Sequence, residues 1–197
     1  MKSFNIILFD GFETLDAFGP AEVVGNMTDE YTLKYYSQKG GIAVSSQRVR
    51  VDTMPFSGID ATGVLLIPGG LGVRVLVNDE EYIERVRALA EKAPYVLTVC
   101  TGSALLAKTN LLNGRNATSN KRVFEWACSN GPEVSWVKRA RWVRDGKFYT
   151  ASGVSAGIDM ILGFVSDTHG VRVAEALADE IEYVRNPDMD DDPFAAN

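Results

Sequence analysis

A cysteine stands where an apolar strand is expected to meet a helix. The stretch VLTVCTGSALL runs from buried-type residues into Cys100, then into a glycine and good helix formers. A thiol on such a turn faces the unpaired N–H groups and the positive end of the helix dipole, which favour the thiolate and lower its pKa. The pattern predicts a nucleophile on a strained strand-to-helix turn, although the full Gly-x-Cys-x-Gly motif is absent. A buried cysteine that only packs as a small apolar residue fits the same pattern.

Two other expected strand ends carry groups that would assist a nucleophile. The segment PGGLG, residues 68–72, offers backbone N–H groups to a developing negative charge, as in an oxyanion hole. The first strand leads into Asp10, Glu13 and Asp16, of which any one could act as acid or base. Taken alone, the glycine segment could be an ordinary turn, and the acidic residues could be ordinary solvated side chains. Their convergence matters, because ligand crevices of parallel sheets lie at the carboxyl ends of the strands.

The elements that must position these groups alternate between strands and helices. Short β-branched or apolar runs predict strands over residues 4–9, 31–37, 63–68 and 95–100. Apolar residues at helical spacing predict a helix over 78–93, with Asn78 and Glu81 as its capping pair. Pro20 is expected at the first position of an earlier helix. Further helices are predicted over residues 102–112, 156–169 and 171–184.

This order predicts an α/β fold with a mostly parallel central sheet covered by helices on both faces. An Asp-Gly pair between two β-rich runs, within residues 140–152, adds a β-hairpin. A length of 197 residues fits one domain over residues 1–197. The acidic tail from about residue 186 is expected to be a surface segment.

Composition narrows the class of protein. Acidic residues outnumber basic ones, 26 against 20, and the basic ones are dispersed apart from a group over residues 138–144, expected to be a solvated face like Lys121 and Arg122. Nucleic acid is therefore not the expected partner. No signal peptide or membrane span is visible, so a cytoplasmic location is expected. Two cysteines are too few for a disulfide framework or metal cluster, and Cys128 is expected to pack in the core.

Four stretches resemble the DJ-1/PfpI superfamily over nearly the whole chain: ILFDGFETLDAFGPAEVV, IPGGLGV, VLTVCTGSALLAKTNLLNGRNAT and VRDGKFYTASGVSAGIDM. Within it, the Cys-Thr-Gly-Ser and Ser-Ala-Gly-Ile-Asp segments are more similar to isocyanide hydratases than to DJ-1 proper. The resemblance implies a flavodoxin-like three-layer sandwich, a homodimer, a small-molecule substrate, and neither a metal nor an organic cofactor.

The resemblance also implies roles for particular residues. Cys100 would be the nucleophile and Asp16 the acid/base, with Thr101 orienting Asp16 and lending its backbone N–H. Gly69 and Gly70 would bind substrate or oxyanion, and Val154 and Ser155 would form the pocket wall. Attack of the Cys100 thiolate on an isocyanide carbon, followed by water, would then yield an N-formamide.

Two departures from the wider superfamily limit the alternatives. Asn120 stands where many members carry a histidine, and the only histidine, His169, is expected at a helix end or on the surface. A Cys-His protease or a glutamine amidotransferase therefore fits poorly. Three other hypotheses for the function remain open in addition to an isocyanide hydratase. They are a glyoxalase or deglycase-like enzyme acting on reactive aldehydes, a redox or stress sensor that oxidises at Cys100, and a ligand-binding regulatory module.

Overall fold

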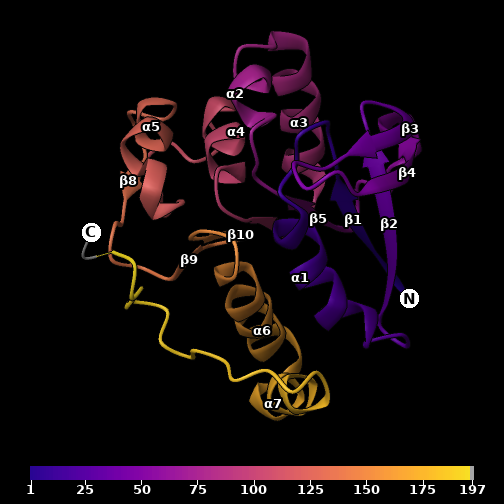
Figure 1. Ribbon diagram of the computed structural model, residues 1–197, viewed down its shortest axis with the longest axis vertical. Helices are drawn as coiled ribbons and strands as arrows, with labels where there is room; N and C mark the ends of the chain where they lie inside the picture. Colours follow the sequence, from indigo (N-terminus) through magenta and orange to yellow (C-terminus); the bar gives the residue numbers. More distant parts are fainter. Residues whose placement is uncertain (196–197) are drawn as a thin grey trace.

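The computed structural model describes residues 1–195, and an eight-stranded sheet lies at its centre (Figure 1). The strand order is β3-β4-β2-β1-β5-β6-β10-β9. Neighbouring strands are parallel except for the pairs β3–β4 and β9–β10, which are antiparallel. The strands are β1 (Lys2–Ile7), β2 (Tyr31–Ser37), β3 (Lys39–Val44), β4 (Arg50–Pro55), β5 (Val64–Ile67), β6 (Val96–Thr98), β9 (Trp142–Asp145) and β10 (Phe148–Ala151).

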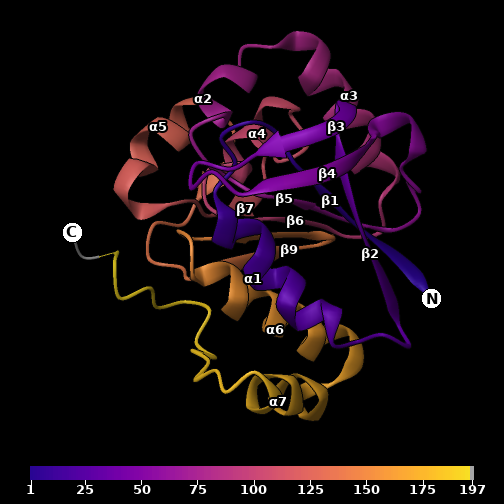
Figure 2. The same cartoon turned by 45° about the vertical axis from the view of Figure 1, so that its right-hand side comes forward.

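Helices cover the two faces of this sheet, which confirms the predicted flavodoxin-like sandwich (Figure 2). On one side lie α1 (Thr14–Gly25), α6 (Ala156–His169) and α7 (Val171–Glu180), with α6 in contact with both others. On the other lie α2 (Val73–Leu76), α3 (Glu80–Lys92) and α4 (Gly102–Lys108), with α5 (Phe124–Ser129) beside α4. The short 3-10 helices η1 (Phe56–Gly58) and η2 (Lys121–Val123) and a small sheet of β7 (Asn116–Ala117) and β8 (Ser135–Trp136) complete the elements.

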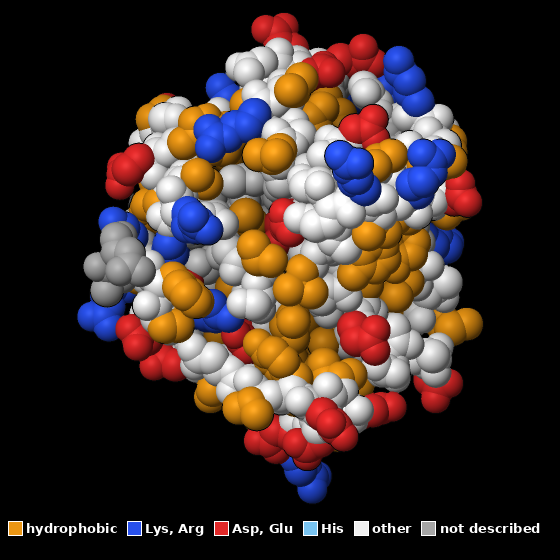
Figure 3. All heavy atoms as spheres, in the orientation of Figure 1, with side chains coloured by type: hydrophobic (Ala, Val, Ile, Leu, Met, Phe, Trp, Pro, Cys, Tyr) orange, Lys and Arg blue, Asp and Glu red, His pale blue; other side chains and the backbone are white. Residues whose placement is uncertain are grey.

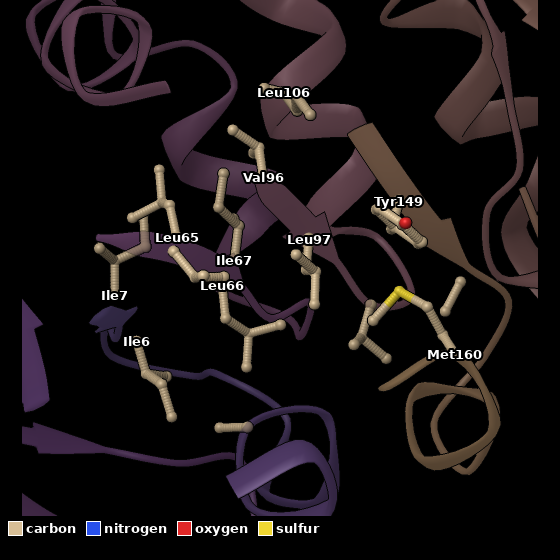
Figure 4. Close-up of a cluster of buried hydrophobic side chains, with 14 of the residues drawn as sticks. Ile6, Ile7, Leu65, Leu66, Ile67, Val96, Leu97, Leu106, Tyr149 and Met160 are labelled. Carbon is tan, nitrogen blue, oxygen red and sulfur yellow. The ribbon is translucent and has the colours of Figure 1, made fainter. Parts of the chain in front are cut away.

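The core lies around the central strands, whose side chains are buried on both faces. Every residue of β5 and β6 is buried, as expected for parallel strands between two helical layers. Figure 4 shows Leu65, Leu66 and Leu97 of these strands in one cluster with Leu106 of α4 and Met160 of α6. Within residues 1–195, no helix combines the length and apolar character needed to cross a membrane.

Several predicted boundaries need correction. The α3 helix begins one residue later than its predicted capping pair implies: Asp79 is the N-cap, and its carboxylate accepts a hydrogen bond from the Tyr82 N–H at 3.0 Å. Pro20 lies inside α1, because that helix already begins at Thr14. Strands β3 and β4 were not predicted. The β9–β10 hairpin and the helix over residues 156–169 are confirmed.

The prediction that the basic residues are solvated is wrong for Lys121 and Arg141. Both side chains are buried, because each finds buried oxygen partners. The Lys121 ammonium group donates to the Ala140 carbonyl at 2.7 Å, and Arg141 Nε donates to Asp159 Oδ2 at 2.9 Å. The acidic tail is not wholly a surface segment either, since Asp192 is buried. On the face seen in Figure 3, the remaining basic side chains are scattered among acidic and apolar ones.

Candidate active site

Cys100 occupies the turn between β6 and α4 and has a strained backbone. Its φ angle is 58°, in the left-handed region, which costs a non-glycine residue about 1–2 kcal/mol. Hydrogen bonds hold the turn in place: the Cys100 N–H donates to the Ser152 carbonyl at 2.9 Å. Its own carbonyl accepts from the hydroxyls of Ser103 and Ser119, each at 3.0 Å. The strained turn expected from the sequence is therefore present.

Three donors surround the Cys100 sulfur. Asn120 Nδ2 lies 3.1 Å from Sγ, and the backbone N–H groups of Thr101 and Val154 also bond to the sulfur. The Asn120 side-chain oxygen accepts from the Arg122 N–H at 2.9 Å, which directs the amide nitrogen toward the sulfur. In the sequence, Asn120 stands out only as a departure from the superfamily. Its contact with sulfur depends on the loop path between β7 and η2, for which no local pattern exists.

Asp16 lies in the first turn of α1 and is fully buried. Its Oδ2 accepts a hydrogen bond from the Gly69 N–H at 2.9 Å. Among the described residues, Oδ1 has no hydrogen-bond partner. Burial raises the pKa of Asp16 to about 8, against the opposing effect of the Gly69 N–H. Asp16 is therefore mainly a neutral carboxylic acid near pH 7.

The prediction of a lowered pKa for Cys100 is wrong. Burial and the neighbouring Asp16 carboxylate raise the pKa of the thiol to about 12, and the bonds from Asn120, Thr101 and Val154 only reduce this shift. Cys100 is 6% exposed, so water stabilises the thiolate little. Near neutral pH both members of the pair keep their protons, and the sulfur must release its proton during attack.

The glycine segment after β5 holds the pair together. Gly69 leaves no room for a side chain, because a Cβ atom there would lie 2.6 Å from the Thr101 nitrogen. The Gly70 N–H donates to Thr101 Oγ1 at 3.1 Å, with Gly70 at a φ of +130°. Thr101 thus contacts Gly70 through its hydroxyl and Cys100 through its N–H, while Gly69 binds the Asp16 carboxylate.

A pocket of about 210 Å³ is lined by Asn120 and Val154, which both contact the Cys100 sulfur, although Cys100 and Asp16 are not part of its lining. Its lining includes Val154 and Ser155, the two residues expected at the pocket wall. Val154 has an unusual φ of 43° for a β-branched residue. The lining also includes Asn120 and Phe194, a residue of the acidic tail. No sequence signal ties Phe194 to the cysteine, which lies 94 positions earlier in the chain.

Other candidate groups lie outside the site. Asp10 is exposed and accepts from the Val44 N–H at 2.9 Å. His169 ends α6, as predicted, and its ring packs edge-on against Tyr31, at the start of β2. The site lies at the opposite, carboxyl ends of the parallel strands. Cys128 is only half-buried on α5 and is not part of the core cluster, so the prediction that it packs in the core is wrong.

Comparisons with known proteins agree with this fold. The model of the DJ-1/PfpI family matches residues 2–167, so the chain belongs to the DJ-1/PfpI family. Isonitrile hydratase of Pseudomonas putida is 31% identical over 94% of this chain and 80% of that protein. The HTH-type transcriptional regulator GbdR of Pseudomonas aeruginosa is 24% identical over 93% of this chain, but this chain spans only 51% of its length.

Solved structures share the fold of this chain. A ThiJ/PfpI family protein from Pseudomonas syringae superposes with a TM-score of 0.81 and 24% identity, covering 94% of this chain and 76% of that one. Drosophila melanogaster DJ-1beta superposes with a TM-score of 0.78 and 20% identity, covering 93% and 98%.

Proposed function

We propose that this protein is a cysteine-dependent enzyme that hydrates isocyanides to N-formamides, with Cys100 as nucleophile and Asp16 as acid/base. The observation that carries the proposal is the hydrogen bond between the strained, buried Cys100 and the buried carboxyl group of Asp16. The likeness to a protein named isonitrile hydratase favours an isocyanide as the electrophile.

In the first step, Cys100 Sγ attacks the terminal carbon of the isocyanide. Asp16 Oδ1, which has no other partner among the described residues, delivers its proton to that carbon as the carbon–sulfur bond forms. The thiol proton returns to Asp16, so the carboxylic acid is neutral again. The product of this step is a thioimidate, Cys–S–CH=N–R. The step needs no oxidant and no reductant.

In the second step, water adds to the thioimidate carbon. Asp16 gives its proton to the nitrogen as it takes a proton from the water, which gives Cys–S–CH(OH)–NH–R and leaves Asp16 neutral. The carbon–sulfur bond then breaks as the hydroxyl oxygen forms the formyl C=O. Sulfur leaves with the hydroxyl proton, passed through Asp16, and O=CH–NH–R is released. Atoms balance with one water consumed for each isocyanide.

Neighbouring groups assist by stabilising charge on sulfur. Release of the thiol proton during attack leaves transient negative charge at Sγ, where the Asn120 amide and the Thr101 and Val154 N–H groups donate hydrogen bonds. Gly69 keeps the Asp16 carboxyl group fixed relative to the sulfur. The Gly70 N–H holds Thr101 in place by donating a hydrogen bond to its hydroxyl oxygen.

The test is turnover of cyclohexyl isocyanide by the purified full chain, with N-cyclohexylformamide measured by chromatography. We expect formamide from the wild type and none above the uncatalysed background from Cys100→Ser. Formation of formamide at equal rates by both proteins would overturn the proposed role of Cys100. A wild type without activity on several isocyanides would overturn the proposed reaction.

A second candidate, a ligand-binding regulatory module, is favoured by the match to HTH-type regulators. A module of this kind would bind its small molecule equally well after Cys100→Ser and would not consume it. A redox sensor is less well supported, because the Cys100 thiol is buried and its pKa is raised to about 12.

A further inference from the structure

The segment of residues 186–195, here called the C-terminal strap, runs from α7 along the β9–β10 hairpin to the side of the molecule that carries α5 (Figure 1). It is attached near its beginning by the Asn186 N–H, which donates to Asp159 Oδ1 at 2.8 Å. The Arg141 N–H donates to the Met189 carbonyl, also at 2.8 Å. The strap is therefore bound to the body of the fold by directed contacts.

A buried carboxylate attaches the far part of the strap. Asp192 Oδ2 lies 4.0 Å from Lys121 Nζ, and Asp192 Oδ1 lies 3.7 Å from Arg141 Nη1. The side chains of Lys121, Arg141 and Asp192 are 3%, 7% and 0% exposed. An acid is seldom buried unless it is paired, so this contact specifies where the strap lies. The Asp192 N–H adds a bond to the Arg139 carbonyl at 2.8 Å.

This anchor places an aromatic ring at the candidate active site. The Phe194 N–H donates to Asp192 Oδ1 at 2.9 Å, which holds the backbone of Phe194 two residues beyond the anchor. Phe194 lines the 210 Å³ pocket together with Asn120, Ser152 and Val154. Those three residues contact Cys100 through its sulfur or its backbone N–H.

We propose that Phe194 is a specificity-determining residue, held by the positioning residue Asp192, and that it forms an apolar wall for the ring of a cycloalkyl or aryl substrate. A cavity of about 150 Å³ accommodates benzene, so a pocket of 210 Å³ holds a six-membered ring. Phe194 is 57% exposed and belongs to the lining of the pocket. The inference rests on the proposed function for the identity of the substrate.

The first test compares substrates that differ in size. In Phe194→Ala, we expect the KM for cyclohexyl isocyanide to rise about tenfold, since apolar contact is lost, while the KM for methyl isocyanide changes less than about twofold. Val184→Ala, which removes an exposed apolar side chain outside the pocket, should change neither value. Equal changes of KM for both substrates in Phe194→Ala would overturn the inference.

The second test needs no turnover. Cys100 is alkylated with iodoacetamide or N-benzyl iodoacetamide, in which sulfur displaces iodide and HI is released, and mass spectrometry gives the rate at each cysteine. We expect the benzyl-to-unsubstituted rate ratio at Cys100 to fall about fivefold or more in Phe194→Ala. An unchanged ratio overturns the role of Phe194 even if isocyanides are hydrated. A lowered ratio in a protein that hydrates no isocyanide supports the wall and refutes the reaction.

The role of Asp192 is tested by non-additivity. Asp192→Asn should lower the same ratio, and the double variant Asp192→Asn/Phe194→Ala should lower it no further than Phe194→Ala alone. A merely structural role of Asp192 would add its own loss in the double variant and would contradict positioning through Phe194. If Asp192→Asn does not fold, the two Phe194→Ala measurements still decide the proposal.

Discussion

The two cysteines of this chain lie in contrasting surroundings. Cys100 sits on a turn with a φ of 58°, accepts hydrogen bonds at its sulfur and contacts a buried acid. Cys128 lies in a regular helix, α5, and is only half-buried. Burial is the largest cause of the raised pKa of both thiols, but the Asp16 carboxylate contributes only at Cys100. The difference teaches that contact with a buried acid, rather than a low thiol pKa, distinguishes the candidate nucleophile.

The largest expected effect separates the two cysteines directly. Cys100→Ser should reduce kcat/KM for cyclohexyl isocyanide by more than about 1,000-fold, because a serine hydroxyl is a far weaker nucleophile. Cys128→Ser should stay within about twofold of the wild type, because Cys128 lies outside the site. Steady-state kinetics of the two variants measure this. A similar loss in both would remove the contrast between the cysteines.

The next effect concerns Asp16, the acid that contacts Cys100 but not Cys128. Asp16→Asn should lower kcat about 100- to 10,000-fold, since the amide cannot relay a proton. In the wild type, kcat/KM should be level below pH 8 and fall above it, because the proton on Asp16, with a pKa of about 8, is then lost. A rate that rises through pH 8 would indicate that the carboxylate, not the acid, is the active form.

Burial of Asp16 also predicts a pH-dependent stability. The folded-state pKa is raised from 3.8 to about 8, so the protonated form stabilises the fold fully below pH 3.8 and this contribution is lost as the pH rises through 8. Relative to wild type, Asp16→Asn should therefore become more stable with rising pH, by at most about 1.4 kcal/mol per pH unit. Urea unfolding from pH 4 to 8 measures the difference, with exposed Asp29→Asn as control. A constant difference would contradict the raised pKa.

The smallest effect concerns the amide beside the sulfur. Asn120→Ala removes a hydrogen bond to developing charge and should lower kcat about tenfold, with little change in KM. Asn113→Ala, which removes an amide bonded to Glu133 at the surface, should leave kcat unchanged. If Asn120→Ala raises KM alone, the amide contacts the substrate rather than the sulfur.

Much of the framework follows from local pattern. Apolar runs predicted strands β1, β2, β5 and β6. Strands that are buried on both faces appear in the sequence as continuous hydrophobic stretches. The edge strands β3 and β4 escaped prediction because their side chains are mostly exposed or half-buried and lack such a run. The Asp-Gly pair marked the β9–β10 hairpin, since few turns other than a tight hairpin favour that pair.

The chain by itself determined the order of strands and helices and the position of Cys100 on a turn, because hydrophobic period and turn chemistry act over a few neighbouring residues. Only the tertiary structure decided the ionisation of Cys100 and Asp16, since desolvation depends on everything packed around a group. It also decided that Lys121, Arg141 and Asp192, far apart in sequence, are buried together. Charged residues look solvated in a sequence, and only the folded chain supplies the opposite charges that let them be buried.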